Sequence, residues 1–186
     1  LGKVVYMVNR GRHRAGRHGF DLVIVDGPPT GEALAMLQLP RTIRRAVKAG
    51  PLARDVSIME ELLTDPSRTA MAVVTAPEEL PVNEALELTR ALEELEMHRG
   101  GAMFVNRVTP SFFDHRTRDA LGRFRRAVRS TRCERDPALL AQLDVHRHLM
   151  GRWDREQDEI RRLRRGTSTP LVELPEIPST TFGSAE

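Results

Sequence analysis

The chain of 186 residues has little cysteine, few aromatic residues and no long apolar run, and each shortage narrows the class of protein. Its one cysteine, Cys133, excludes an internal disulfide framework and predicts a reducing, cytoplasmic compartment. Aromatic residues make up 4% of the chain, too few to interleave with basic residues as base-stacking proteins require. No apolar stretch approaches the roughly 18–20 residues of a membrane helix. The sequence therefore predicts neither a transmembrane segment nor a nucleic-acid partner.

The remaining composition is that of a soluble globular domain. Hydrophobic residues make up 40% and charged residues 30% of a chain long enough to bury one core. The net charge is +3, and the arginines cluster near 10–17, 116–135 and 161–165. We interpret these clusters as solvated helix faces rather than a site for a phosphate-rich partner. The chain starts at Leu1, without a signal-peptide layout, so we expect it to be a piece of a longer protein.

Short apolar runs of strand type alternate with amphipathic segments of helical period. The runs predict strands over 20–26, 69–75, 102–106 and 171–174. The amphipathic segments predict helices over 32–39 (ending near Pro40), 42–49, 56–63, 83–98, 113–129 and 137–164. Alternation of this kind is typical of an α/β fold, in which a parallel sheet is flanked by helices.

Polar residues stand where the predicted strands end. Asp26 and the turn Gly27–Gly31 follow the first strand, Thr75–Glu79 follows the second, and Asn106 closes the third. Ligands of open parallel sheets bind at the carboxyl ends of the strands. A carboxylate such as Asp26 can hold Mg²⁺ through water there, although taken alone it equally fits a helix cap or a turn.

Four segments in order resemble the ArsA ATPases, the family of the arsenite-pump ATPase and its relatives in tail-anchored protein targeting. Asp26–Pro40 (DGPPTGEALAMLQLP) resembles the family's switch II segment, and 63–84 its next strand and helix. Val105–Val108 (VNRV) is similar to the strand end whose asparagine contacts adenine. The stretch 174–183 is similar in spacing to the adenine-side loop. The resemblance implies a P-loop NTPase-like fold and an ATPase.

The resemblance also implies a role for each matching residue. Asp26 would be the catalytic, Mg²⁺-side carboxylate, with the metal held through water. Pro29, Thr30 and Gly31 would form the switch II segment that senses the γ-phosphate. The adenine-binding residues would be as follows: Asn106, Pro175 and Gly183.

One family element is missing from the sequence. A glycine-rich turn ending in Gly-Lys-Thr or Gly-Lys-Ser does not occur, and the early Gly2-Lys3 is followed by Val4. We therefore expect the sheet to lack its N-terminal P-loop strand, and the isolated chain not to hydrolyse ATP. ATP and Mg²⁺ would serve the full-length protein only.

The chain is expected to be one partial ArsA-like domain over 1–186. Its expected parts are 20–40 (strand plus switch II), 41–68 (short helical insertion), 69–108 (strand–helix–strand), 112–165 (long charged helices) and 170–183 (last strand and adenine-side loop). The expected function is an ATP-driven conformational switch, working as a homodimer or a heterodimer with a related ATPase, on a cargo or membrane partner that the sequence does not identify. The alternatives are a P-loop-less regulatory subunit that pairs with an active ATPase and, with less support, a DNA-associated member of the wider group. The expected location is the cytoplasm, with peripheral membrane contact allowed.

Overall fold

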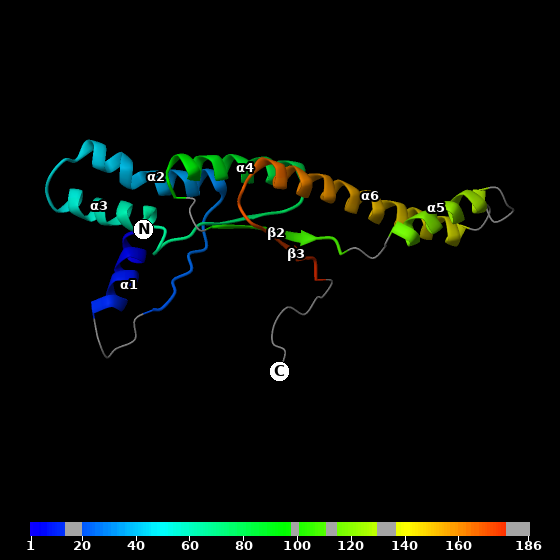
Figure 1. The fold of residues 1–186 in the computed structure, drawn as a ribbon, viewed down its shortest axis with the longest axis horizontal. Helices are drawn as coiled ribbons and strands as arrows, with labels where there is room; N and C mark the ends of the chain where they lie inside the picture. Colours follow the sequence, from blue (N-terminus) through cyan, green and yellow to red (C-terminus); the bar gives the residue numbers. More distant parts are fainter. Residues whose placement is uncertain (14–19, 98–100, 111–114, 130–136, 178–186) are drawn as a thin grey trace. The chain divides into compact units, whose positions relative to one another are not determined.

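The computed structural model describes residues 1–13, 20–97, 101–110, 115–129 and 137–177. The elements are drawn in Figure 1. In chain order they are α1 (Gly2–His13), α2 (Thr30–Ala46), α3 (Pro51–Thr64), β1 (Ala72–Thr75), α4 (Glu79–Glu94), β2 (Ala102–Val108), α5 (His115–Arg129), α6 (Pro137–Gly166) and β3 (Leu171–Pro175).

The strands form one parallel sheet in the order β1-β2-β3. Buried and more exposed residues alternate along β1 and the first part of β2, and Met103 and Val105 of β2 are fully buried. Burial at every second residue is the pattern of a strand whose one face packs against a core. The parallel sheet with flanking helices confirms the predicted α/β class, and strands occur within or around the predicted runs 69–75, 102–106 and 171–174.

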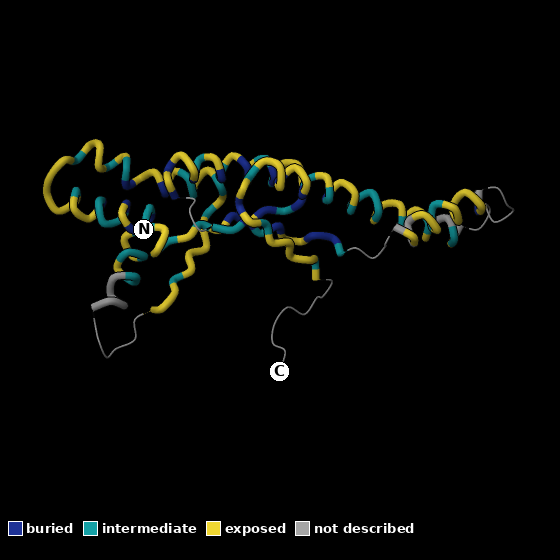
Figure 2. The backbone as a smooth tube through the Cα atoms, in the orientation of Figure 1, coloured by how far each residue is buried: buried dark blue, intermediate teal, exposed yellow. Residues whose placement is uncertain are grey.

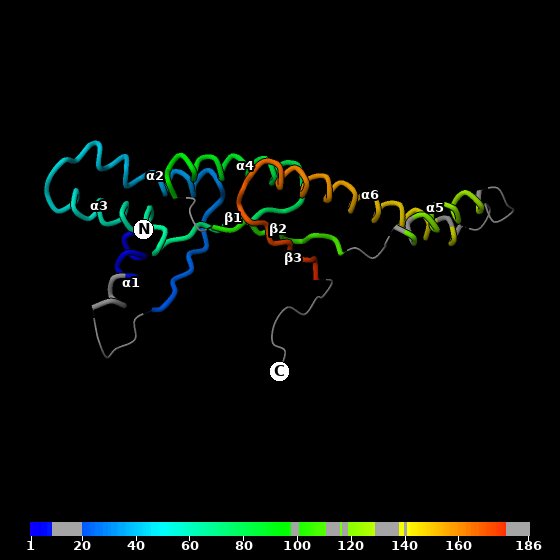
Figure 3. The backbone as a smooth tube through the Cα atoms, viewed as in Figure 1, coloured from blue at the N-terminus to red at the C-terminus, as the bar shows by residue number. Residues whose placement is uncertain are grey.

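The chain divides into two compact units, and the boundary passes through β1, α4 and β2. Unit 1 comprises Leu1–Val73 and Asn83–Met103, and unit 2 comprises Val74–Val82 and Phe104–Glu186. Figure 3 follows the chain through both units by colour. Each unit is built around its own buried residues and is described separately below.

Unit 1 is built around the pair α2 and α3, which pack against each other. Leu37 and Pro40 are the buried residues of α2, and Val56, Leu62 and Leu63 are buried apolar residues of α3. Gly50 turns the chain between the two helices with φ of 99°, a conformation that favours glycine. The short connection therefore makes α2 and α3 a helical hairpin.

Helix α2 continues past the proline that was predicted to end its first half. The predicted helices 32–39 and 42–49 are one helix, with Pro40 in its interior. A proline at this position cannot donate a hydrogen bond to the carbonyl of Met36, which disfavours the helix locally. Pro40 is nevertheless fully buried, so packing against the hairpin partner compensates for the lost hydrogen bond.

Unit 2 is built around β2, β3 and α6. The apolar residues Ile160 and Leu163 of α6 are buried, as are Val105 and Val108 of β2. The predicted helices 113–129 and 137–164 correspond closely to α5 and α6. Within the described ranges, no helix is both long enough and apolar enough to cross a bilayer. Although α6 has 30 residues, charged side chains recur from Asp144 to Arg165.

The predicted strand 20–26 is not formed in the structure. The segment has no regular secondary structure, and Figure 2 shows most of its tube as exposed. Leu22 is 73% and Ile24 84% exposed. A strand requires a neighbour to take its backbone hydrogen bonds, and the described residues provide none here. The prediction of a strand over 20–26 is therefore wrong for the described structure: the apolar run has strand composition, but no described strand pairs with it.

Helix α1 was not anticipated from the sequence. It covers Gly2–His13 and contacts α3 within unit 1. The first residues carry valines and a methionine at helical spacing, but arginines and glycine at its C-terminal end weaken the periodic signal. Contact with α3 supplies the stabilisation that this weak local preference lacks.

Candidate functional site

The N-terminus of α2 is an uncapped helix end in unit 1. Pro29 occupies the N-cap position and makes no side-chain cap, and its carbonyl accepts the first helical hydrogen bond, from the Ala33 amide at 2.9 Å. The amides of the first turn, Thr30 to Glu32, precede this bond and have no acceptor within the helix. Uncapped amides and the positive end of the helix dipole together favour an anion at this position.

Open space surrounds the first turn of α2. A Cβ placed on Gly31 would meet no heavy atom within 4 Å, and Gly31 is exposed. The hydroxyl of Thr30 stands beside it on a half-buried residue. A ligand can therefore approach the backbone at Gly31 closely, which a side chain would hinder.

Asp26 lies three residues before this helix cap. The residue is exposed, and its carboxylate makes no hydrogen bond or ion pair with any part of the chain that the structure describes. An ionised carboxylate without a protein partner retains its capacity for a hard cation and its water ligands. The loop Asp26–Gly31 thus offers a cation ligand and an anion-binding helix end on one continuous segment.

The other half of α2 is fixed by Arg41. The Arg41 guanidinium donates to Glu60 Oε1 of α3 at 3.2 Å and to the main-chain carbonyl of Leu95 at 2.8 Å. Arg44 Nε lies 2.8 Å from the second oxygen of Glu60, whose side chain is 12% exposed. Helix α2 is therefore anchored at its C-terminal half to α3 and to the turn after α4, while its first turn is open.

In unit 2, Asn106 stands near the end of β2 and is exposed. Its Oδ1 accepts a hydrogen bond from the backbone N–H of Arg107 at 2.9 Å. Arg107 has φ of 60°, in the left-handed region that an arginine rarely adopts. Since Oδ1 is used locally, the side-chain amide of Asn106 remains able to donate a hydrogen bond outward.

The ends of β2 and β3 lie side by side. The Glu176 amide donates to the Val108 carbonyl at 2.8 Å, one residue beyond β3 and at the last residue of β2. Because the strands are parallel neighbours, this register places Pro175 at the same edge as Asn106. Gly183 lies outside the described residues. Two of the three predicted adenine-side positions therefore share one edge of the sheet in unit 2.

A buried carboxylate holds that edge in place. Glu156 of α6 is 4% exposed and accepts hydrogen bonds from both the amide and the hydroxyl of Thr109, each at 2.8 Å. Arg152 donates to Glu156 at 2.7 Å and to Glu176 at 3.0 Å, and Arg107 lies 3.7 Å from Glu176. The hydrogen bond that Arg152 donates to Glu156 raises the pKa of the Arg152 guanidinium above its ordinary value. The network ties α6 to the loops that follow β2 and β3.

This network was not predicted from the sequence, although the position of Glu156 along α6 indicated a buried charge. Glu156 precedes Ile160 by four residues and Leu163 by seven, which places a carboxylate on the buried stripe of α6. A charged side chain at such a position requires a buried partner. Arg152, one turn earlier, supplies the charge, but the Thr109 contact spans 47 residues and could not be read from spacing.

Two histidines of α6, His146 and His148, stand two residues apart along the chain. In the structure, Nδ1 of His146 lies 2.7 Å from the Gln142 carbonyl, and Nδ1 of His148 lies 2.9 Å from the Asp144 carbonyl. Both rings thus contact the backbone of their own helix. Cys133 lies outside the described residues.

The parallel sheet and its flanking helices form an α/β arrangement that is consistent with a P-loop NTPase-like fold. The sequence profile of the family described as anion-transporting ATPase matches residues 5–57 and 50–130. These matches cover more than half of the chain, so the chain belongs to the anion-transporting ATPase family.

Two relatives are similar to parts of the chain. ATPase BagA of Mycobacterium tuberculosis is 33% identical over 95 residues, which are 51% of this chain and 27% of that protein. The arsenical pump-driving ATPase of Escherichia coli is 36% identical over 90 residues, which are 47% of this chain and 15% of that protein. The chain therefore corresponds to about a quarter of the first relative and less of the second.

Proposed function

We propose that this chain is the switch-bearing and adenine-binding part of an ArsA-type ATPase that couples ATP hydrolysis to a conformational change. The observation that carries the proposal is the uncapped first turn of α2, with the unpaired carboxylate of Asp26 on the segment leading into it. Family membership supports the assignment of this segment as switch II.

Magnesium and the terminal phosphate fit the residues present on this segment. The unpaired carboxylate of Asp26 suits a Mg²⁺ ion that keeps its water ligands, since hard cations prefer oxygen donors. The amides of the first turn and the Thr30 hydroxyl suit a phosphate oxygen. When bound, ATP supplies the phosphoryl group for transfer to water, and Mg²⁺ supplies charge neutralisation.

The anchoring of α2 gives the proposed switch its mechanical basis. Pro29, Thr30 and Gly31 sense whether a terminal phosphate is present, and their position sets the position of the helix. Arg41 connects α2 to α3 and to the Leu95 carbonyl. A shift of α2 must therefore either move these neighbours with it or break the Arg41 hydrogen bonds, which provides two discrete states.

Adenine recognition is assigned to the edge of unit 2. The amide of Asn106 donates to an acceptor on the base ring, and Pro175 packs against it from the neighbouring strand. Gly183, which lies outside the described residues, is assigned to the adenine-side loop by the family resemblance alone. The network around Glu156 keeps this edge in place, so the side chain of Asn106 is presented on a fixed backbone.

The chain is proposed to act within one partial ATPase domain, as a cytoplasmic homodimer or heterodimer with a related ATPase, on a cargo or membrane partner not yet identified. Its sequence has no Gly-Lys-Thr or Gly-Lys-Ser loop, so the isolated 186 residues are expected to be inactive. The same absence favours a second candidate, a regulatory subunit that pairs with an active ATPase. If adding the chain increased the ATP turnover of an active family member, this result would favour the regulatory subunit over the first candidate.

The proposal is tested by replacing Asp26 with Asn in the full-length protein. We expect Mg²⁺-dependent ATP turnover to fall at least about 100-fold while the unfolding curve stays unchanged, since the Asp26 carboxylate forms no hydrogen bond or ion pair with the described residues. Asp55→Asn, an exposed carboxylate on α3, is the matched control and should retain turnover. Turnover near the wild-type rate in Asp26→Asn would contradict the assignment.

A further inference from the structure

Helix α5 is an amphipathic helix with a strongly basic side. It contains six arginines and a single acidic residue, Asp119. At 100° per residue, the apolar residues fall within one arc of the helix and the arginines occupy the rest. The apolar arc consists of Ala120, Leu121, Phe124, Ala127 and Val128.

Four arginines of α5 have described side chains, and none of the four forms an ion pair with another described residue. Those with described side chains are exposed: Arg116, Arg123, Arg125 and Arg126. Several arginines of α6 differ, since Arg152, Arg161, Arg162 and Arg164 form ion pairs with carboxylates. The four described guanidinium groups of α5 stand close together on one short helix and are available to an external anionic surface.

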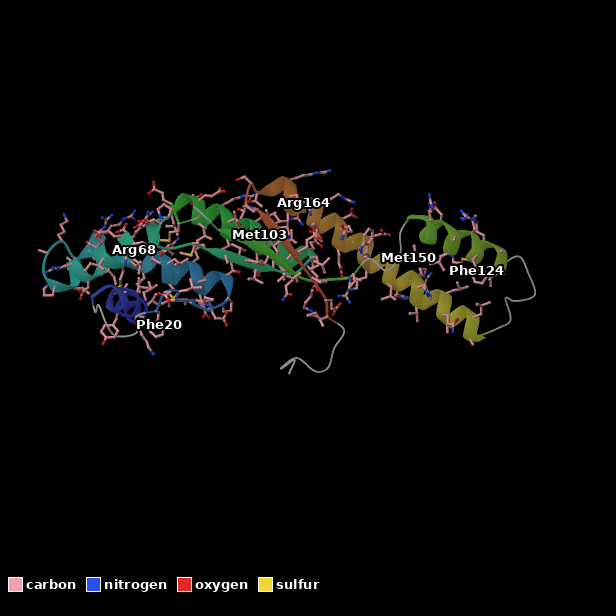
Figure 4. The ribbon with its side chains drawn as sticks, turned by 60° about the horizontal axis from the view of Figure 1, so that its bottom comes forward. Phe20, Arg68, Met103, Phe124, Met150 and Arg164 are labelled. Atoms are coloured by element: carbon pink, nitrogen blue, oxygen red, sulfur yellow. The ribbon has the colours of Figure 1, made fainter. Side chains whose placement is uncertain are left out.

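The apolar arc of α5 is covered on one side only. Val128 is 5% exposed, whereas Phe124 is 49% exposed and the neighbouring Ala120 and Ala127 are exposed. Figures 1 and 4 both show α5 running beside the N-terminal half of α6, and Figure 4 labels Phe124. On the helical wheel, Arg116 and Arg123 border the exposed half of the arc on the side of Ala127, roughly 80–100° from Phe124.

The adjoining half of α6 also exposes apolar side chains. Val145 is 57% and Leu149 is 39% exposed. Because both helices of this pair expose apolar residues, we interpret them as parts of one interaction surface and not as isolated exposed side chains.

From this arrangement we propose that α5 docks on an anionic lipid surface, lying in the plane of the bilayer. Phe124 enters the boundary between headgroups and acyl chains, and Arg116 and Arg123 bind lipid phosphates beside it. A nucleic acid would use the arginines but leave the apolar arc in water. An anionic membrane surface matches both sides of the helix, because its headgroups bind the arginines and its acyl chains cover the apolar arc. This membrane contact does not depend on the proposed nucleotide switch.

The test is flotation of the whole chain with vesicles of phosphatidylglycerol or of phosphatidylcholine alone. We expect binding to the anionic vesicles that weakens as salt is added, and little binding to the neutral ones. The double variant Arg116→Gln/Arg123→Gln should bind the anionic vesicles about 30-fold more weakly, because each arginine contributes about one electrostatic contact with a lipid phosphate and two are removed. The control Arg161→Gln/Arg162→Gln removes equal charge from α6 and should bind as the wild type.

A second variant reports directly on insertion. Phe124→Trp should be quenched by brominated anionic lipid more strongly than the native Trp153 alone. The proposal would be overturned if the wild type bound neutral vesicles as tightly as anionic ones, or if it bound no vesicles at low salt. It would also be overturned if the wild type bound duplex DNA but no vesicles. A fourth contrary result is a wild type that forms a dimer and binds no vesicles, with the dimer lost in Phe124→Ser. The wild-type salt dependence decides the question even if a variant unfolds.

Discussion

Arg41 of α2 donates a hydrogen bond to the main-chain carbonyl of Leu95, 54 residues later in the chain, at 2.8 Å. The same guanidinium contacts the nearly buried Glu60 of α3. One side chain thus connects the candidate switch helix with two other parts of unit 1. The stability of unit 1 and the coupling of the switch both depend on this residue.

We expect Arg41→Ala to lower the free energy of unfolding by about 2 kcal/mol, because Glu60 loses a partner and the Leu95 carbonyl loses its donor. Urea unfolding followed by circular dichroism measures the change. Arg45→Ala removes an exposed arginine from the same helix and should alter stability by less than about 0.5 kcal/mol. Equal effects of the two substitutions would show that the Arg41 contacts carry no stability.

Gly31→Ala separates the proposed phosphate contact from stability. Because a Cβ at Gly31 meets nothing within 4 Å, we expect the unfolding free energy to change by less than about 1 kcal/mol. ATP turnover of the full-length protein should fall at least about 10-fold, since the methyl group occupies the space of a phosphate oxygen. Gly50→Ala is the converse control. Its φ of 99° predicts lost stability and retained turnover per folded molecule.

Arg107→Gly is expected to stabilise the protein by about 0.5–1 kcal/mol, because glycine accepts φ of 60° without steric cost. The exposed ion pair with Glu176 at 3.7 Å offsets little of this gain. Arg90→Gly in the exposed part of α4 should instead lower stability by about 1 kcal/mol. Thermal unfolding of both variants compares the two positions, and a loss of stability in Arg107→Gly would indicate that its side chain matters more than its backbone.

Glu156→Gln is expected to cost about 2–3 kcal/mol, since charge-assisted hydrogen bonds with Arg152 and Thr109 are lost in a buried site. Hydrogen exchange at the Thr109 amide should accelerate with the loss of stability. Glu159→Gln removes a surface pair with Arg162 and should have a small effect. An unchanged exchange rate at Thr109 in Glu156→Gln would contradict the role given to the network.

Asn106→Ala should weaken the preference of the full-length protein for ATP over GTP more than it weakens phosphate binding. The reason is that the lost amide is assigned to the base and not to the phosphates. Titration with ATP, GTP and tripolyphosphate measures the three affinities. If Asn106→Ala lowered the affinity for all three ligands equally, the proposed contact between Asn106 and the base would be wrong.

The sequence predicted the elements whose stabilising partners lie close along the chain. The apolar period of α4 and the buried run of β2 were legible because local pattern and packing agree in them. Segment 20–26 failed as a strand because strand formation depends on a neighbour that the described chain does not provide. The predicted end of a helix near Pro40 was wrong, because the burial that keeps Pro40 inside α2 comes from tertiary packing and cannot be read from local sequence. Asp26 and Asn106 were predicted as site residues from their position at the ends of apolar runs and from the family resemblance. The Glu156 network could not be predicted, because it depends on contacts over long sequence distances.

The most direct test of the proposed switch is hydrogen exchange of the peptide covering Asp26 to Leu37 in the full-length protein. The account predicts slower exchange of the Thr30–Glu32 amides with Mg²⁺ and a non-hydrolysable ATP analogue than with Mg²⁺ and ADP, since only the triphosphate provides an acceptor for these amides. Identical exchange in both states, in a preparation that hydrolyses ATP, would contradict the assignment of this segment to the terminal phosphate.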